Sequence, residues 1–379
     1  MRLSSRSLRA FYSPLALLLS QVAEMPALKS MLKIGRDVLI IALITLGLGE
    51  LSLRIYNYFD PLPIFYSDSY NRFRGKPFSP DFSFHLNSRG FKDVEFTTTK
   101  AAGTIRILGV GDSFAFGVVP YEYTYLTLLE QQLKESGHNV ELINMGIPGI
   151  GPKEYLALLA REGFVLEPDK VLLSFYVGND FFDLFEESRS FVSHSYVASL
   201  ITYAYSFWTN VEGQIIHSLP ANAKYSDDAA AFTDDHYWRM QLLGRDIYLQ
   251  HNQGFDDIFE RAITYISEIK QLCDRRNVGL TIVIIPAEMQ ISKALQARLM
   301  ADPGLAPTSF DFKRPNRFLR ARFEELRIDY IDLLPEFAIR PPHERLYKRN
   351  DIHWSIAGNA LAATLISQHL SSQLGSVDR

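Results

Sequence analysis

Cysteine is almost absent from this sequence, and basic residues are not in excess. The 379 residues include one cysteine, Cys273, which excludes an intramolecular disulfide framework and any metal site built from several cysteines. Cys273 lies in the segment IKQLCDRRN, whose pattern indicates a helix interior and a structural role. The formal net charge of -4 provides no basic field of the kind that holds a polynucleotide, so we exclude a nucleic-acid partner.

A long apolar run lies near the N-terminus. Residues 38–53, VLIIALITLGLGELSL, carry a charge only at Glu50, and their neighbours extend the run toward the roughly 20 residues that span a bilayer. We therefore predict a transmembrane signal anchor over residues 34–58. No small-residue cleavage site follows, which favours an uncleaved anchor over a removed signal peptide. A buried amphipathic helix of a soluble protein is the alternative.

The charges that flank this run predict its orientation. Lys29, Lys33 and Arg36 precede it closely, whereas only Arg54 follows as closely. Because positive charge favours the cytoplasmic side, we expect a single-pass membrane protein whose C-terminal part is extracytoplasmic, on the periplasmic side in a bacterium. Residues 1–33 are then a cytoplasmic tail, or an extension ahead of a true start.

The chain after the anchor divides into a stem and an α/β domain. Residues 59–103 are rich in Pro, Phe and Tyr without a sustained period, and we expect loop structure lying on the domain. Over residues 104–379, apolar strands alternate with helical stretches, which is typical of a mostly parallel sheet with crossover helices. The predicted strands are 104–110, 140–145, 170–176, 280–285 and 328–332, and the predicted helices are 125–134, 153–161, 255–276 and 356–369.

Residues 181–254 separate the third and fourth predicted strands. A crossover of this length needs structure of its own. It contains an aromatic stretch, SYVASLITYAYSFW, and an acidic one, YSDDAAAFTDDHYW. We predict a helical cap or lid inserted in the domain, with aromatic residues that serve packing more than substrate binding.

The turn GVGDSFAFG, residues 109–117, follows the first predicted strand but fits none of three common site motifs. A dinucleotide-binding turn needs G-x-G-x-x-G, and Phe114 occupies its third glycine position. A phosphate loop needs Gly-Lys-Ser/Thr, which does not occur. The nucleophile elbow of α/β-hydrolases needs G-x-S-x-G, and Ala115 stands at its last glycine.

The turn does place Ser113 at the carboxyl end of the first strand, where open parallel sheets hold their sites. A serine there can be a nucleophile if a base and oxyanion donors lie nearby, although capping a helix is the other interpretation. Candidate partners follow later strands: Gly146 in INMGIPGIG, Asn179 in FYVGND, and Asp351 and His353 in NDIHWS. In an extended segment, the last two side chains would project to one side.

The blocks GDSF, NMG, GND and DIHW, in this order at the ends of successive segments, resemble those of the SGNH hydrolases, also called the GDSL esterase/lipase family. The resemblance covers about residue 104 onward and implies a flavodoxin-like three-layer sandwich with a mostly parallel five-stranded sheet. It implies that Ser113 is the nucleophile, that His353 is the general base and then acid, and that Asp351 orients His353. It also implies three oxyanion donors: the N–H groups of Ser113 and Gly146 and the side chain of Asn179.

The last block departs from the family pattern. The common D-x-x-H spacing would put Asn350 in the place of the acid, whereas Asp351 gives D-x-H-W. The latter spacing is similar to that of alginate O-acetylation proteins, although their block lies upstream of the serine. We assign the acid to Asp351. The segment NSRGFKD, residues 87–93, also resembles one that precedes the GDS block in membrane-anchored members, with a plain Asn/Gly turn as the alternative.

These features predict an enzyme that transfers acyl groups through Ser113. With water as acceptor, it is a membrane-anchored esterase for ester bonds, in particular O-acyl groups of a carbohydrate. With a sugar hydroxyl as acceptor, it is an O-acetyltransferase of a cell-surface polysaccharide. An inactive glycan-binding or scaffolding protein is the third possibility. The sequence offers no metal-ligand spacing, and we expect neither a metal nor a cofactor.

Overall fold

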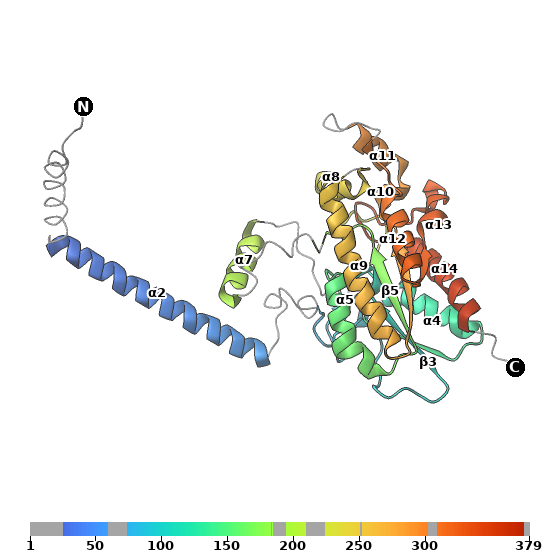
Figure 1. Ribbon diagram of the computed structural model, residues 1–379, viewed down its shortest axis with the longest axis horizontal. Helices are drawn as coiled ribbons and strands as arrows, with labels where there is room; N and C mark the ends of the chain where they lie inside the picture. The colour runs from blue at the N-terminus through green and yellow to red at the C-terminus, as the bar shows by residue number, and fades with distance from the viewer. Residues whose placement is uncertain are drawn as a thin grey trace, which may run out of the picture.

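A parallel sheet lies at the centre of the main domain, with helices on both faces (Figure 1). The computed structural model describes residues 26–59, 74–182, 184, 195–209, 224–250, 252–301 and 309–374. The strand order is β4-β3-β5-β6-β7 and every neighbouring pair is parallel, as in flavodoxin-like folds. The predicted fold class is therefore confirmed. The strands, each within one residue of its predicted ends, are β3 (Ile105–Val110), β4 (Val140–Asn144), β5 (Lys170–Tyr176), β6 (Gly279–Ile285) and β7 (Asp329–Asp332).

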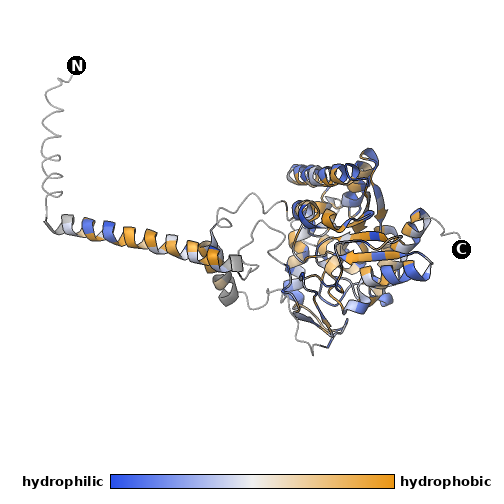
Figure 2. Cartoon of the chain, turned by 90° about the horizontal axis from the view of Figure 1, so that it is seen from below, coloured by the Kyte–Doolittle hydropathy of each residue, from blue (hydrophilic) through white to orange (hydrophobic). Residues whose placement is uncertain are grey.

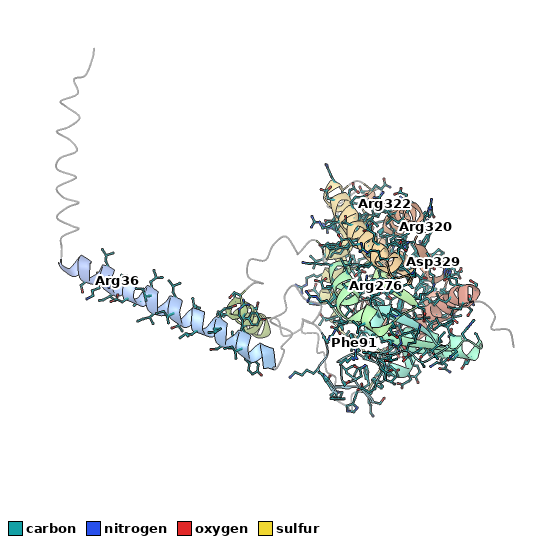
Figure 3. All side chains as sticks on the ribbon, turned by 60° about the horizontal axis from the view of Figure 1, so that its bottom comes forward. Arg36, Phe91, Arg276, Arg320, Arg322 and Asp329 are labelled. Carbon is teal, nitrogen blue, oxygen red and sulfur yellow. The ribbon has the colours of Figure 1, made fainter. Side chains whose placement is uncertain are left out.

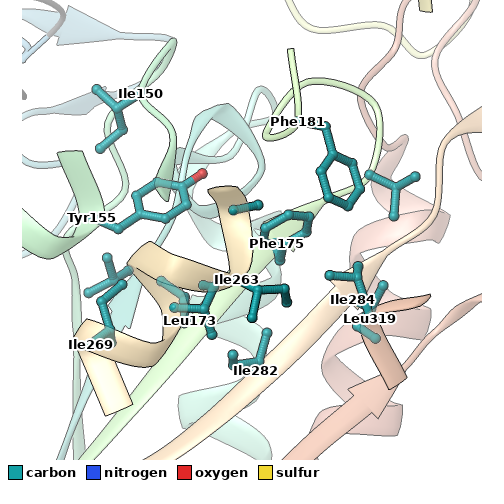
Figure 4. Close-up of a cluster of buried hydrophobic side chains, with 14 of the residues drawn as sticks. Ile150, Tyr155, Leu173, Phe175, Phe181, Ile263, Ile269, Ile282, Ile284 and Leu319 are labelled. Carbon is teal, nitrogen blue, oxygen red and sulfur yellow. The ribbon is translucent and has the colours of Figure 1, made fainter. Parts of the chain in front are cut away.

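The central strands are buried on both faces, which explains their nearly continuous apolar sequences. Alternate residues of β5 supply two cores: Leu173 and Phe175 enter one (Figure 4), and Leu172 enters the other. Helices α5 (Pro152–Leu158), α9 (Gln253–Asp274) and α12 (Arg314–Glu325) cover the first core, and α4 (Tyr125–Glu135) and α14 (Ile356–Leu374) cover the second. Cys273 is fully buried in the first core, as its structural role requires.

The four predicted helices are present as α4, α5, α9 and α14. Helix α5 ends earlier than predicted, because a π-helical turn, η4 (Leu159–Gly163), follows it. Helix α12 was not predicted, since its buried apolar positions form only a narrow stripe through Leu319 and Phe323. Short elements complete the domain: α3 (Ser113–Phe116), η3 (Tyr121–Tyr123), η5 (Phe164–Leu166), α10 (Glu288–Ile291), α11 (Lys293–Met300), α13 (Leu334–Ala338) and η9 (Pro342–Glu344).

Helix α2 (Pro26–Phe59) extends away from the domain. Its segment Ser30–Tyr56 is long and apolar enough to cross a membrane, and none of its most apolar part is buried. Figure 2 shows this apolar stretch, and Figure 3 places Arg36 toward its N-terminal end. The helix begins before the predicted anchor, and residues 1–25 of the predicted tail lie outside the described residues. Its sidedness stays a prediction.

The predicted stem and insertion are described in part. The stem from residue 74 is mostly irregular, with a small antiparallel pair of β1 (Pro80–Asp81) and β2 (Phe84–His85). The insertion contributes α7 (Tyr196–Thr209), α8 (Asp234–Leu243) and η7 (Gly244–Tyr248). Helix α7 lies beside α2 (Figure 1), whereas α8 belongs to the main domain. The predicted domain boundaries and the cap remain predictions.

Candidate active site

Ser113 opens helix α3, directly after strand β3. The preceding Asp112 caps this helix, since its side chain accepts a hydrogen bond of 2.9 Å from the Phe114 N–H. Strands β4 and β5 flank β3, so the segments that follow all three strands meet at one edge of the sheet. This edge is where the strand order reverses, the place at which open α/β sheets bind ligands.

The DIHW block forms a bend rather than the extended segment that we expected. A β-bridge between Tyr347 and Trp354 closes this loop, and the Lys348 N–H donates to the His353 carbonyl at 3.0 Å. Within it, the backbone N–H of His353 donates to Asp351 Oδ1 at 3.1 Å. The bend therefore places the Asp351 carboxylate beside the His353 side chain, although the segment is not an extended strand.

The structure brings Ser113, His353 and Asp351 into one hydrogen-bonded line. His353 Nε2 lies 2.7 Å from Ser113 Oγ, and His353 Nδ1 lies 2.6 Å from Asp351 Oδ1. Burial alone would raise the pKa of Asp351, but His353 and Lys348 hold it well below its usual range. An ionised carboxylate only accepts hydrogen bonds, so Nδ1 carries the proton and Nε2 is left to accept one from the serine.

Asn350, the alternative acid position, points away from this line. Its Nδ2 donates to the Phe232 carbonyl at 3.2 Å and also contacts Asp234, at the start of α8. Further contacts hold the same segment against the loop, since the Arg349 N–H donates to the Asp227 carbonyl at 3.2 Å. The second half of the insertion therefore supports the DIHW loop from outside.

Lys348 is a residue that sequence reasoning missed. Its Nζ lies 3.0 Å from Asp351 Oδ2, the carboxylate oxygen that His353 does not use. Both side chains are almost fully buried. The signal in the sequence was only a lysine three residues before the acid, which is common on any polar loop.

Gly146 does not fit the role of an oxyanion donor, and this prediction is wrong. Its N–H donates to Asn144 Oδ1 at 2.8 Å, so it is not free for a substrate oxygen. A Cβ at Gly146 would lie 2.2 Å from the backbone nitrogen of Phe116. Gly146 is therefore a glycine because α3 packs directly on it.

Gly149 is the better candidate for that donor. It lies on the turn after β4, is partly exposed and has a φ of 70°, a conformation that favours glycine. Within the described ranges its N–H has no hydrogen-bond acceptor, whereas the nearby Ile147 N–H donates to the Gly111 carbonyl at 3.1 Å. The sequence INMGIPGIG does not show which of its glycines has a free N–H, so Gly149 could not be preferred to Gly146, three residues earlier, without the structure.

Asn179 lies at the end of β5, on a turn that Asp180 holds in place. Asp180 accepts hydrogen bonds from the Tyr176 N–H at 2.9 Å and from the Tyr155 hydroxyl at 2.8 Å. The Asn179 amide faces Asp112 and favours the charged form of that carboxylate. Since an amide nitrogen carries two N–H groups, Asn179 can contact Asp112 and still donate to a bound oxyanion.

Replacing Asn179 by alanine is expected to lower turnover about 10²- to 10³-fold, the usual effect of losing one oxyanion donor. The measurement is kcat for p-nitrophenyl acetate. Asn139→Ala is the matched control, because that exposed asparagine lies at the opposite end of the sheet and should keep the parent's rate. An Asn179→Ala rate within a few-fold of the parent would remove Asn179 from the donor set.

The segment NSRGFKD ties the stem to the site. Asn87 closes a turn, because its side-chain oxygen accepts a hydrogen bond from the Phe91 N–H at 3.0 Å. Lys92 is fully buried, pairs with Asp81, and donates to the carbonyls of Gly117 at 2.8 Å and Val119 at 2.6 Å. These carbonyls belong to the loop that leaves α3, so Lys92 supports the residues beside Ser113.

Asp93 extends the same support to the neighbouring strand. Its Oδ2 accepts from the Asn144 N–H at 2.7 Å, and its Oδ1 accepts from the Tyr121 hydroxyl at 3.1 Å. Burial raises the pKa of Asp93 to about 7, against the effect of these hydrogen bonds. The motif therefore fixes both chain segments next to Ser113, which explains its place ahead of the GDS block.

Glu288, at the start of α10, is a partly buried acid beside the site. It accepts a hydrogen bond from the Tyr237 hydroxyl of α8. Burial raises its pKa from 4.5 to about 7, and the charge of Asp351 adds to this effect. Burial likewise raises the pKa of Asp112 to about 6. The folded protein therefore binds more protons than the unfolded chain between about pH 4.5 and 7.

This surplus predicts that stability falls as the pH rises through that window. Ionising Glu288 in the folded state costs up to about 3 kcal/mol above pH 7. Glu288→Gln should therefore narrow the difference in unfolding free energy between pH 5 and pH 8, as measured by urea denaturation. Glu336→Gln, a change at an exposed carboxylate, serves as control and should leave that difference as it is in the parent. An unchanged difference in Glu288→Gln would contradict the prediction.

A shallow depression in the surface lies at the hydrogen-bonded line. The ring of Trp354 forms part of its wall and packs edge-on against Phe114, with ring centroids 4.9 Å apart. Its lining residues are Ser113, Phe114, Gly117, Val118, His353, Trp354 and Asn359. The serine is thus reached from solvent through a shallow, partly aromatic opening.

Comparison with protein families gives one match. Residues 242–378, about a third of the chain, match the model described as an SGNH hydrolase-like domain of the acetyltransferase AlgX. The matched part contains Asp351 and His353, whereas Ser113 lies upstream of it. A search of curated proteins finds no match.

Comparison with solved structures gives esterases and acylhydrolases of low sequence identity. An acetyl xylan esterase, AlAXEase, has 14% identity and a TM-score of 0.41, covering 70% of this chain and 100% of its own. A lipase/acylhydrolase from Enterococcus faecalis has 15% identity and a TM-score of 0.40, covering 73% and 100%. A two-domain esterase active on acetylated mannans, CEX, has 14% identity and a TM-score of 0.38, covering 72% and 50%.

Proposed function

We propose that this chain is a membrane-anchored serine esterase acting on O-acyl groups, those of a carbohydrate in particular, because residues 242–378 match an SGNH hydrolase-like domain. The observation that carries the proposal is the hydrogen-bonded line from Ser113 through His353 to Asp351 at the carboxyl edge of the sheet. A serine, an imidazole and an ionised carboxylate in this geometry are the components of nucleophilic acyl transfer.

In the first half of the reaction, Ser113 Oγ attacks the ester carbonyl carbon while His353 Nε2 takes the hydroxyl proton. The charge that develops on the carbonyl oxygen is stabilised by the N–H groups of Ser113 and Gly149 and by the Asn179 amide. The carbon–oxygen bond to the alcohol then breaks, and His353 returns the proton to the departing alcohol. This leaves the acyl group on Ser113 as an ester.

In the second half, an acceptor hydroxyl attacks the acyl-serine. His353 takes the proton of the acceptor, and after the bond to Ser113 breaks it returns that proton to the serine. Asp351 stabilises the imidazolium in both halves and keeps its Nδ1 protonated. Water as acceptor gives an esterase, and a sugar hydroxyl gives a transferase.

An O-acetyltransferase of a cell-surface polysaccharide is the second candidate, because the matching family model is described as that of an acetyltransferase. The candidate membrane span of α2 is consistent with a substrate at the cell surface. Acetate release from an acetyl donor in the absence of sugar favours the esterase. Turnover of the acetyl donor that depends on an added oligosaccharide with free hydroxyl groups, with slow hydrolysis in its absence, favours the transferase.

The experiment that tests the proposal is labelling of the full chain, in detergent, with a fluorophosphonate, followed by mass spectrometry. We expect the label on Ser113, and no label in Ser113→Ala. If the folded chain carries no label and Ser113→Ala binds polysaccharide as the parent does, the chain is instead an inactive binding or scaffolding protein.

A further inference from the structure

Helix α7 is an apolar helix that lies beside α2 rather than on the sheet domain (Figures 1 and 3). Its sequence, YVASLITYAYSFWT, has ten apolar residues among fourteen and no charged residue. Ile201 is 62% exposed and Leu200 is 38% exposed. An exposed apolar surface of this kind is costly in water and indicates that something covers it.

The side chain of Glu50, in α2, joins the two helices by accepting hydrogen bonds from the first residues of α7. Its Oε1 accepts from the Tyr196 N–H at 3.0 Å, and its Oε2 accepts from the Val197 N–H and the Ser195 hydroxyl, each at 3.0 Å. The first N–H groups of a helix have no partner within the helix, and a carboxylate is their preferred cap. Glu50 therefore fixes the position at which α7 begins.

The same contacts explain a charge within the candidate membrane span. Glu50 lies inside Ser30–Tyr56, where an isolated carboxylate is costly. Arg54, one turn further on, pairs with Glu50 at 2.6 Å and stacks its guanidinium 4.5 Å from the Tyr196 ring centroid. Close packing accompanies the polar contacts, since a Cβ at Gly49 would lie 3.4 Å from the Val197 side chain.

We propose that α7 is a second membrane-bound helix, which Glu50 holds against the anchor and whose exposed apolar residues contact lipid. The lipid bilayer is what covers these residues, because α7 is joined to the segment that is long and apolar enough to span a bilayer. Tyrosine and tryptophan, of which α7 has four, are enriched at the boundary between headgroups and acyl chains. The inference rests on the membrane anchoring in the proposed function and deepens it, since two helices restrict the domain to the membrane surface.

The test uses the full chain in phosphatidylcholine nanodiscs, with a fluorescent probe on single added cysteines. Cys273 is buried and should not react. The probe positions are Ile201 on α7, Leu46 on the anchor and Val165 on η5 of the main domain, all exposed. A quencher carried on the lipid chains should remove about half or more of the fluorescence at 201 and 46, and little at 165.

Replacement of Glu50 by leucine removes the cap but keeps the anchor apolar. In Glu50→Leu, quenching at 201 should fall to the level at 165 while quenching at 46 persists. Asp37→Asn is the matched control, because the Asp37 carboxylate lies on the same helix but pairs with Arg36. We expect this substitution to leave all three signals unchanged. Retained quenching at 201 in Glu50→Leu would overturn the role of Glu50.

The outcomes separate this inference from the anchoring itself. Quenching at 46 but not at 201 would overturn the proposal for α7 and leave the anchor in place. Absence of quenching at both positions would overturn the anchoring too. If 201 is shielded from both the lipid quencher and aqueous iodide, a protein surface covers α7, and the lipid proposal fails.

Discussion

Asp351→Asn is expected to lower kcat for p-nitrophenyl acetate by about 10⁴-fold while leaving the domain folded. The carboxylate accepts the Nδ1 proton of His353 at 2.6 Å, which leaves Nε2 free to accept the proton of Ser113. An asparagine can turn its amide N–H toward Nδ1 and so favour the other tautomer, in which Nε2 already carries a proton. The ring then cannot act as a base. Steady-state kinetics, with circular dichroism melting to verify the fold, measure the effect.

The matched control is Asn350→Gly. Asn350 occupies the position that the common family spacing gives to the acid, but its side chain contacts Phe232 and Asp234. Its φ of 48° favours glycine, so the substitution removes the side chain without backbone strain. We expect turnover within a few-fold of the parent. The assignment of the acid is wrong if Asn350→Gly loses activity as strongly as Asp351→Asn does.

The sheet could be predicted from sequence because its strands are short apolar runs with turn residues between them. Strand β5, for example, is apolar over almost its whole length and is buried on both faces, so the ends of the apolar run mark the ends of the strand. Helix α12 was not predicted because half of its residues are charged and the stripe of residues that it buries is narrow. Local periodicity thus identifies the elements that bury a wide face, and it misses those that bury a narrow one.

The proposed catalytic line was predictable for a different reason. Ser113 follows a strand end, and the topology of a parallel sheet brings such ends to one edge. The pairing of Asp351 with His353 was expected from their spacing, but the cause is a bend in which the acid also accepts the backbone N–H of the histidine. Topology and sequence proximity therefore bring the predicted residues together, even though the local geometry that we expected was wrong.

The supporting residues could not be found in this way. The Gly146 N–H is not free, because it donates a hydrogen bond to the Asn144 side chain, and this contact favours Gly149 as the donor. Lys92 contacts loop carbonyls 25 and 27 residues away, and nothing in its own segment points to them. Such contacts are decided by tertiary structure, which a single sequence does not display.

Lys92→Met is expected to destabilise the protein by about 3–5 kcal/mol, the usual cost of removing one partner of a buried ion pair. The substitution keeps the length of the side chain but leaves Asp81 and the carbonyls of Gly117 and Val119 without their cation. Burial lowers the pKa of Lys92, and the charge of Asp81 opposes this effect. The charged form of Lys92 is therefore stabilised by the Asp81 carboxylate. Urea denaturation, followed by fluorescence, measures the loss.

Two comparison variants make this prediction specific. Lys100→Met removes a more exposed pair with Asp169, and should cost no more than about 1 kcal/mol. The double variant Asp81→Asn with Lys92→Met removes both buried charges, so it should be less destabilised than Lys92→Met alone. A Lys92→Met variant as stable as Lys100→Met would refute the role given to this buried lysine. If Lys92→Met is unstable but the double variant is no better, the lost bonds to Gly117 and Val119, rather than the unpaired carboxylate, account for the cost.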